Sequence, residues 1–176
     1  DEYGYPKTEN VQYSDNINIK TKYAYNESTD LSKLYMIGIL KDKTITTTSN
    51  GTTLINRTFV PVWSNNRPIV KAYSLNNKQT KQEVYSYDTY GNIISVSTSL
   101  YSGGNPQKSF YEYDSYGRLT KETNPLRLAT KYAYNARGNV STITDYRGGR
   151  TIFTYDEFDR QTYVIYPDNT PKLTSY

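Results

Sequence analysis

The chain has 176 residues and a formal net charge of +4, from 21 basic and 17 acidic side chains, and it contains neither cysteine nor histidine. The lack of cysteine excludes disulfides and thiolate sites, and the lack of histidine removes the usual general base and the commonest metal ligand. No block of five like charges and no stretch approaching the roughly 20 apolar residues of a membrane helix occurs. We therefore expect no nucleic-acid partner, no membrane span, no cofactor or metal, and no catalytic residue.

Tyrosine dominates the apolar part of the composition. Only 35% of the residues are hydrophobic, and 21 residues of the chain are tyrosines. Tyrosine and threonine favour strands, and a tyrosine ring with its polar hydroxyl suits a sheet face that meets water. The alternative, disorder, is disfavoured by this density of aromatic and β-branched residues. The composition predicts an all-β protein with two partly solvated sheet faces.

The first eighty residues are expected to be divergent β-strands of the same sheet as the rest of the chain. A short helical turn is the weaker reading of residues 30–36. Threonine- and isoleucine-rich runs at residues 43–48 and 52–62 predict two strands, and Asn50-Gly51 between them is a strong two-residue hairpin signal. Residues 65–68 and Asn76-Asn77 read as further turns.

Residues 81–176 contain about four copies of one tyrosine-rich motif. Its pattern is Tyr-x-Tyr-Asp-x-aromatic-Gly followed by Asn or Arg, as in YSYDTYGN and YEYDSYGR. The second tyrosines lie at 87, 113, 134 and 155, spaced by 26, 21 and 21 residues, and a further period reaches Tyr176. The last repeat is therefore expected to be truncated. The motif residues are Tyr85, Tyr87, Asp88, Gly91, Tyr111, Tyr113, Asp114, Gly117, Arg118, Tyr132, Tyr134, Asn135, Gly138, Phe153, Tyr155, Asp156 and Arg160.

Each motif predicts a β-hairpin. Asp114 can accept a backbone hydrogen bond two residues on, and Gly117 can adopt the left-handed conformation without a Cβ penalty. Together they favour a type I turn with a glycine bulge. Asn124-Pro125 is expected to end the outgoing strand. In the last copy Asp159 stands in the glycine position, where we expect the turn to persist with some strain.

These residues resemble the YD repeat, also called the RHS repeat, most clearly over residues 82–176. The resemblance implies strands of successive hairpins that wind into a spiral around a hollow shell. Members of that family include bacterial toxin-carrying proteins, toxin-complex subunits and the teneurins. The resemblance also implies a secreted or cell-surface bacterial location. The DPxG-type motif that closes many such shells is not found in this sequence.

Three interpretations of the function compete. The first is a non-catalytic wall segment of a larger RHS protein, whose partners are the remainder of that protein and an enclosed toxin or effector. The second is a surface module that binds glycan or cell wall through tyrosine-lined faces. The third, a hydrolase, is disfavoured because Asp88, Asp114 and Asp156 recur at turn positions. An uncapped sheet edge near the last residue also predicts self-association by strand pairing or domain swapping.

Overall fold

The computed structural model describes residues 6–13, 17–25, 40–64, 67–168 and 170–173. Every regular element in these residues is a strand, and the strands follow one another in chain order as an antiparallel array. The predicted all-β fold of tandem hairpins is confirmed. The helical turn expected at residues 30–36 and the first half of the turn expected at 65–68 lie outside the described residues, whereas Arg67 and Pro68 begin a strand.

The chain divides into two compact units. Unit 1 comprises residues 1–85 and 97–106, and unit 2 comprises residues 86–96 and 107–176. The expected boundary between residues 80 and 81 stays a prediction. Each unit is described by itself below.

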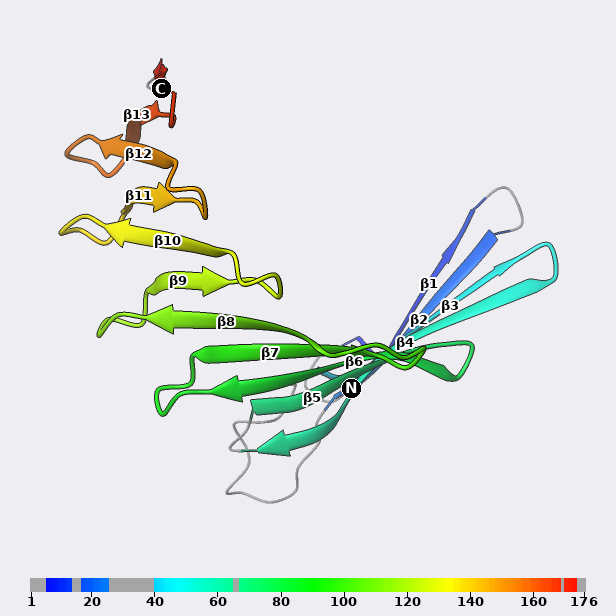
Figure 1. Cartoon of the computed structure of the whole chain (residues 1–176). Helices are drawn as coiled ribbons and strands as arrows, with labels where there is room; N and C mark the ends of the chain where they lie inside the picture. The colour runs from blue at the N-terminus through cyan, green and yellow to red at the C-terminus, as the bar shows by residue number, and fades with distance from the viewer. Residues whose placement is uncertain (1–5, 14–16, 26–39, 65–66, 169, 174–176) are drawn as a thin grey trace, which may run out of the picture. The chain divides into compact units, whose positions relative to one another are not determined.

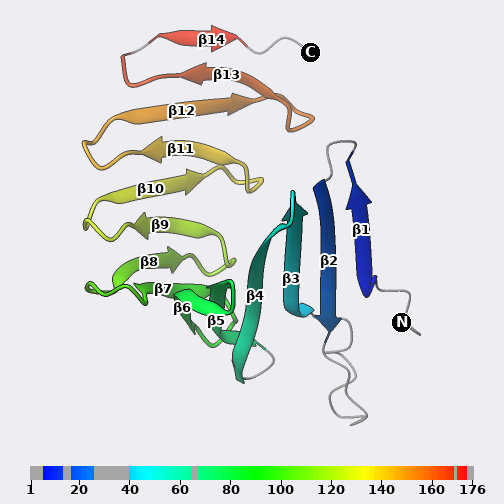
Figure 2. The same cartoon turned by 90° about the vertical axis from the view of Figure 1, so that its right-hand side faces the viewer.

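Unit 1 is built from long strands (Figure 2). The strands are β1 (Thr8–Gln12), β2 (Ile17–Tyr25), β3 (Leu40–Ser49), β4 (Thr52–Ser64) and β5 (Arg67–Leu75), with most of β6 (Lys78–Tyr87) and part of β7 (Ile93–Leu100). Neighbours pair in antiparallel register from β1 to β6. The strand predictions at residues 43–48 and 52–62 are therefore confirmed.

The tight turns of unit 1 adopt the left-handed backbone conformation that asparagine and glycine tolerate best. Asn50 and Gly51 have φ angles of 47° and 78°, and Asn76 and Asn77 have φ angles of 47° and 64°. Positive φ at both central residues belongs to the type I′ turn, whose twist matches that of the flanking strands. Asn76 also accepts a bond from the Ile55 amide through its Oδ1, at 2.8 Å. Both turn predictions are confirmed.

Unit 2 is a series of shorter hairpins (Figure 1). Its strands are part of β7 with β8 (Gln107–Tyr113), β9 (Leu119–Thr123), β10 (Ala129–Tyr134), β11 (Val140–Thr144), β12 (Arg150–Tyr155), β13 (Gln161–Ile165) and β14 (Pro171–Leu173). A β-bulge follows the motif in three hairpins, at the register shifts beside Tyr113, Tyr134 and Tyr155. Bulges increase local twist and fix the register of the pair.

Few of the described side chains are fully buried. Among the described residues the buried hydrophobic side chains are Val60, Ala72 and Val164, joined by the polar Thr21 and Ser95. Alternate residues of the motif strands are half-buried, as in Ser109, Tyr111 and Tyr113 of β8. The fold is consistent with sheets stabilised by side-chain ladders along half-buried faces rather than by a thick two-layer core.

Candidate functional site

The motif residues head a repeated hairpin turn. We call residues 88–92, 114–118, 135–139 and 156–160 the Tyr-Asp turns. In the second of them, the Asp114 amide donates to the Arg118 carbonyl at 2.9 Å and the Gly117 amide donates to the Asp114 carbonyl at 3.0 Å. The other three Tyr-Asp turns repeat both bonds. The turns therefore lie at the four predicted places, and each has the hydrogen bond from its fourth to its first residue and the predicted left-handed fourth residue.

The Asx side chain organises each of these turns. Asp114 Oδ1 accepts from the backbone amides of Tyr116 and Arg118, at 2.9 and 3.0 Å. Its other oxygen, Oδ2, accepts from Arg118 Nε at 2.7 Å. Asp156 and Arg160 repeat this arrangement, and Asn135 keeps the two amide bonds with a neutral side chain. The carboxylates are thus engaged by the turn that they head.

The opposite ends of the hairpins carry a second set of Asx turns that the sequence analysis missed. We call residues 124–128 and 145–149 the return turns. Asn124 Oδ1 accepts from the amides of Leu126 and Leu128, and Asp145 Oδ1 accepts from those of Arg147 and Gly149. The signal was present, because an Asn or Asp stands ten residues after Asp114 and ten residues after Asn135. The 21-residue period therefore contains two turns of one type.

The second tyrosine of the motif links successive hairpins. The hydroxyls of Tyr113, Tyr134 and Tyr155 donate to the carbonyls of Ile93, Leu119 and Val140, at 2.9, 2.7 and 2.8 Å. Each acceptor is the residue that follows the preceding Tyr-Asp turn. A half-buried hydroxyl thus satisfies a backbone carbonyl of the neighbouring hairpin. We call these three contacts the tyrosine ladder.

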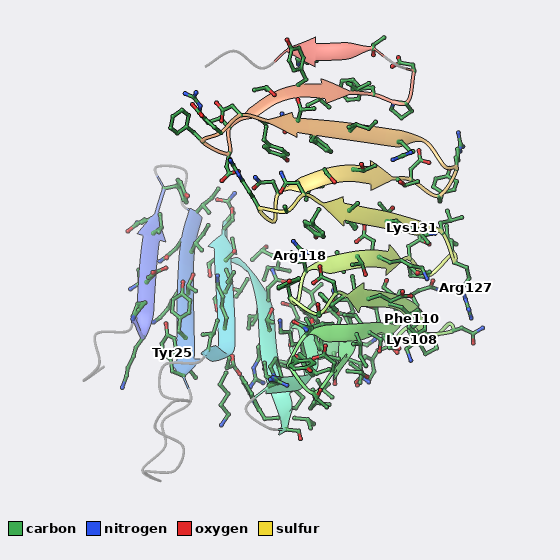
Figure 3. All side chains as sticks on the ribbon, turned by 90° about the vertical axis from the view of Figure 1, so that its left-hand side faces the viewer. Tyr25, Lys108, Phe110, Arg118, Arg127 and Lys131 are labelled. Carbon is green, nitrogen blue, oxygen red and sulfur yellow. The ribbon has the colours of Figure 1, made fainter. Side chains whose placement is uncertain are left out.

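The last residue of one Tyr-Asp turn also contacts a tyrosine of the next hairpin. The Arg118 guanidinium lies over the Tyr116 ring of its own turn and over Tyr134 of the next hairpin, 4.9 and 4.6 Å from the centroids. Cation–π contacts of this kind are attractive. Figure 3 shows Arg118 at the end of its hairpin, on the side opposite to Arg127. The arginine of one repeat therefore contributes to the packing of the following one.

The glycine position of the fourth motif is occupied by Asp159, with a φ of 61°. Its Oδ1 accepts from Asn139 Nδ2 at 2.7 Å and lies 3.4 Å from Arg137 Nη1. Arg137 Nη1 also donates to the Glu157 carbonyl at 2.7 Å. The expected left-handed residue is present, and the preceding turn supplies contacts that stabilise it.

The first aromatic residues of the motif have more varied surroundings. The Tyr132 hydroxyl donates to Glu122 on the adjacent strand at 2.7 Å. In unit 1 the hydroxyls of Tyr85 and Tyr73 both donate to Glu83 Oε2, at 2.6 and 2.8 Å. Burial, with the hydrogen bond to the carboxylate second, raises the pKa of Tyr73 and of Tyr132 to about 12. Phe153 pairs with the buried Val164 across β12 and β13.

The turn aspartates are held in their charged form. Burial acts to raise the pKa of Asp88, Asp114 and Asp156, but the hydrogen bonds from their turns outweigh it and lower the pKa below the ordinary value of 3.8. Catalytic acids and bases need a pKa near the working pH. The pKa of each of these carboxylates is shifted away from neutral pH, and their oxygens already accept hydrogen bonds from the turn.

Metal-binding groups, concavities and membrane-spanning helices are further features that could indicate a function in the described residues. No group of three or more acidic side chains within them is arranged to hold a metal ion. A concavity of about 520 Å³ lies between the third and fourth Tyr-Asp turns, and its lining includes Arg137, Phe153 and Asp159. No helix in the described part of the chain could span a membrane.

Comparison with known proteins agrees with the repeat geometry. Residues 134–171, which include the third and fourth Tyr-Asp turns, match the family model described as RHS Repeat. This segment is similar to an RHS repeat. The family-model match confirms the predicted resemblance over these residues. No functionally curated protein matches the chain.

Two solved structures share the fold of this chain. One is TcdB2-TccC3 without its hypervariable C-terminal region, with a TM-score of 0.55 and 14% identity, covering 91% of this chain and 9% of that one. The other is a Photorhabdus luminescens Tc holotoxin pore with a substitution in TccC3, with a TM-score of 0.54, 14% identity and the same coverages of 91% and 9%. The chain thus spans a small part of either relative, and the likeness at this identity establishes the fold.

Proposed function

We propose that this chain is a non-catalytic wall segment of a larger RHS-repeat protein, and that the wall belongs to a hollow β-shell that encloses or presents a toxin or effector. The motif residues named above act in this proposal as structural units of the wall. Its partners are the remainder of the repeat protein and the enclosed polypeptide. A secreted or cell-surface bacterial location belongs to the same proposal.

The observation that carries the proposal is the tyrosine ladder. Tyr113, Tyr134 and Tyr155 each satisfy a carbonyl of the preceding hairpin, so each repeat completes its neighbour. Stability in such arrays is a sum of unit and nearest-neighbour contributions, and the array grows by adding equivalent units. The tyrosine ladder can therefore join successive hairpins into a long continuous wall. The shared fold with TcdB2-TccC3 supports the same conclusion.

The non-catalytic part of the proposal has a separate basis. The aspartates of the repeat, the only acidic residues that recur with its period, accept bonds from backbone amides and from Arg or Asn side chains of their own turns. A carboxylate engaged in this way and with a lowered pKa lacks the properties of a general acid at neutral pH.

Glycan binding by the tyrosine-lined face receives no comparable support. The hydroxyls of Tyr113, Tyr134 and Tyr155 donate to main-chain carbonyls, and that of Tyr132 donates to Glu122. Their hydrogen-bonding capacity is directed into the sheet, where a sugar could not reach it without breaking the ladder.

The proposal is tested on the full protein that carries this chain. Electron cryomicroscopy of the wild type should show a hollow particle with residues 107–173 in its wall, and the particle should protect an enclosed segment from added protease. Replacing Tyr134 and Tyr155 together by Phe should increase the rate at which that segment is cleaved, whereas Tyr116→Phe should not. A solid or extended particle without a lumen, or a hydrolytic activity lost in Asp114→Asn, would contradict the proposal.

A further inference from the structure

One return turn holds an arginine where four of the other turns hold glycine. Arg127 is the fourth residue of the turn headed by Asn124 and has a φ of 65°. Gly91, Gly117, Gly138 and Gly148 occupy the equivalent position elsewhere, with φ between 77° and 100°. A left-handed backbone is unfavourable for a residue with a Cβ, and such outliers cluster at functional positions. Asp159, the other exception, is stabilised by Asn139, whereas Arg127 has no such contact within the described residues.

Arg127 is one of four unpaired cations on one side of unit 2. We call Lys108, Arg127, Lys131 and Arg150 the basic edge; all four are exposed, and none has a carboxylate partner among the described residues. Lys131 lies directly across from Lys121 on β9 and from Thr144 on β11, and Thr144 pairs in turn with Arg150. Residues paired across strands share a face, so Lys131 and Arg150 project from the same side of the sheet.

The arrangement places like charges together at a cost in stability. Lys121 is neutralised by Glu112, whose Oε1 lies 2.7 Å from its Nζ, but Lys131 beside it is not. Like charges directly opposite one another destabilise a sheet. A strained Arg127 and an uncompensated Lys131 at the same edge are a local conflict of the kind expected at a functional surface.

The basic edge also has shape and apolar surface. A concavity of about 370 Å³ is lined by Arg127, Ala129, Lys131 and Tyr146. Tyr146 is 51% exposed, and Phe110, 37% exposed, lies 5.0 Å from Lys108 Nζ. Figure 3 shows Lys108, Phe110, Arg127 and Lys131 on the same side of the view, opposite to Arg118. The concavity has room for an amino-acid side chain between two cations and an aromatic ring.

We propose that the basic edge is a docking surface for an acidic polypeptide segment, with a carboxylate of that segment held between Arg127 and Lys131. The planar guanidinium of arginine matches a carboxylate in a bidentate geometry, and lysine adds a point charge. The exposed rings of Phe110 and Tyr146 would contact the apolar parts of the same segment. The inference rests on the charge and backbone of unit 2 and is independent of the shell proposal.

The local charges favour a polypeptide over a nucleic acid. A nucleic acid binds through a continuous run of phosphate contacts. The cross-strand row that contains Lys131 begins with Glu112, and Asp145 lines the concavity. A polymer with a charge on every unit would meet these carboxylates, whereas a peptide places its acidic side chains selectively.

The test measures binding of a fluorescent peptide in which glutamates alternate with leucines to the whole chain by anisotropy at low salt. Arg127→Gly and Lys131→Gln should each weaken binding about two- to fivefold, the range expected for an exposed ion pair. Lys20→Gln, which removes an exposed strand lysine of unit 1, is the matched control and should leave affinity unchanged. Arg127→Gly should also maintain or raise the melting temperature, because glycine suits the left-handed turn position.

Two outcomes would overturn the proposal. One is a failure of Arg127→Gly and Lys131→Gln to weaken peptide binding more than Lys20→Gln does, because an equal effect shows charge attraction without a site. The other is tighter binding of single-stranded DNA of matched charge, or of phosphatidylserine vesicles, with the same dependence on Arg127 and Lys131. That result would assign the surface to a different partner.

Discussion

At the scale of single residues, the Asx side chain at the head of each turn supplies a hydrogen-bond acceptor to backbone amides that a tight turn leaves without one. Asp114 receives two amides on one oxygen, and Asn124, Asn135, Asp145 and Asp156 do the same. The charge is therefore secondary to the geometry of the acceptor. Gly117 and its equivalents complete the turn because they alone adopt positive φ without a Cβ penalty.

Replacing Gly117 by Val is expected to destabilise unit 2 by about 1–2 kcal/mol. A Cβ at this position would lie 3.8 Å from Asn92 Oδ1, an ordinary contact, so the loss comes from the backbone and not from a clash. Urea unfolding of the variant measures it, with Gly117→Asn as the control because asparagine tolerates this conformation better. Equal stability of Val and wild-type chains would contradict the turn assignment.

Asp114→Ala is expected to lower stability more than Asp114→Asn, because asparagine keeps the acceptor for both amides and loses only the pairing with Arg118. The hydrogen bonds hold the pKa of Asp114 below 3.8. Its charged form therefore contributes stability above that pH, and the contribution disappears as pH falls through the lowered pKa. Melting temperatures near neutral pH and in acid should show the gap between wild type and Ala narrowing in acid. A gap of constant size would contradict the role of the charge.

At the scale of elements, hairpins are joined by side chains as well as by strand pairing. One hairpin is marginal in water. The tyrosine ladder and the contacts of Arg118 and Asn139 each connect a turn to the hairpin after or before it. The β-bulge beside Tyr134 lies in the pairing of β10 with β11, whereas the Tyr134 hydroxyl donates to the Leu119 carbonyl of β9 on the other side of β10.

Tyr134→Phe is expected to cost about 1 kcal/mol, the usual net contribution of a hydrogen bond whose acceptor is left unsatisfied. Tyr116→Phe serves as the control, because the Tyr116 ring lies at a turn tip and is 81% exposed. Chemical denaturation of both variants makes the comparison. If the two substitutions had the same effect, the ladder would contribute nothing measurable.

Asn139 and Asp159 should be energetically coupled. A double-mutant cycle with Asn139→Ala and Asp159→Gly should give a coupling free energy below about 1 kcal/mol but above zero, as for other exposed pairs. Asn139→Ala alone should destabilise the chain less when residue 159 is glycine. Additive effects would mean that the 2.7 Å contact between the two side chains does not stabilise the turn.

At the scale of the whole molecule, both units use a tyrosine hydroxyl bound to a carboxylate. Tyr73 donates to Glu83 in unit 1, and Tyr132 donates to Glu122 in unit 2. Such networks stabilise half-buried faces that contain few aliphatic side chains. They also make the stability of both units depend on tyrosine remaining protonated.

The chain is expected to lose stability in alkali between pH 10 and 12. The pKa of Tyr73 and of Tyr132 is raised from 10.0 to about 12 in the folded chain. A raised pKa contributes stability that is fully present below the unfolded value of 10.0 and is lost as pH rises through the folded value. Denaturation of wild type and of a Tyr73→Phe, Tyr132→Phe double variant should show a smaller decline in the variant. Parallel declines would assign the alkaline sensitivity to other groups.

Much of this fold could be predicted from local sequence. The alternation of tyrosines in the motif, the Asx at the turn head and the left-handed fourth residue determine a hairpin within a few residues of chain. The return turns could have been found in the same way, since Asn124 and Asp145 repeat the signal of Asp114 and Asn135. The return turn at Asn124 was missed because the proline after it was interpreted only as the end of a strand.

The contacts between repeats were decided by tertiary structure alone. The Leu119 carbonyl lies 15 residues from Tyr134, and Asp159 lies 20 residues from Asn139. Which side chain meets which acceptor over such a separation depends on strand register and on the bulges that shift it, and neither can be read from composition or spacing. The basic edge arose in the same way, because Lys131 and Arg150 come to the same face only when β10, β11 and β12 pair. Local chemistry thus determined the hairpins, and long-range strand register decided which side chains meet between repeats and which lie together on an exposed face.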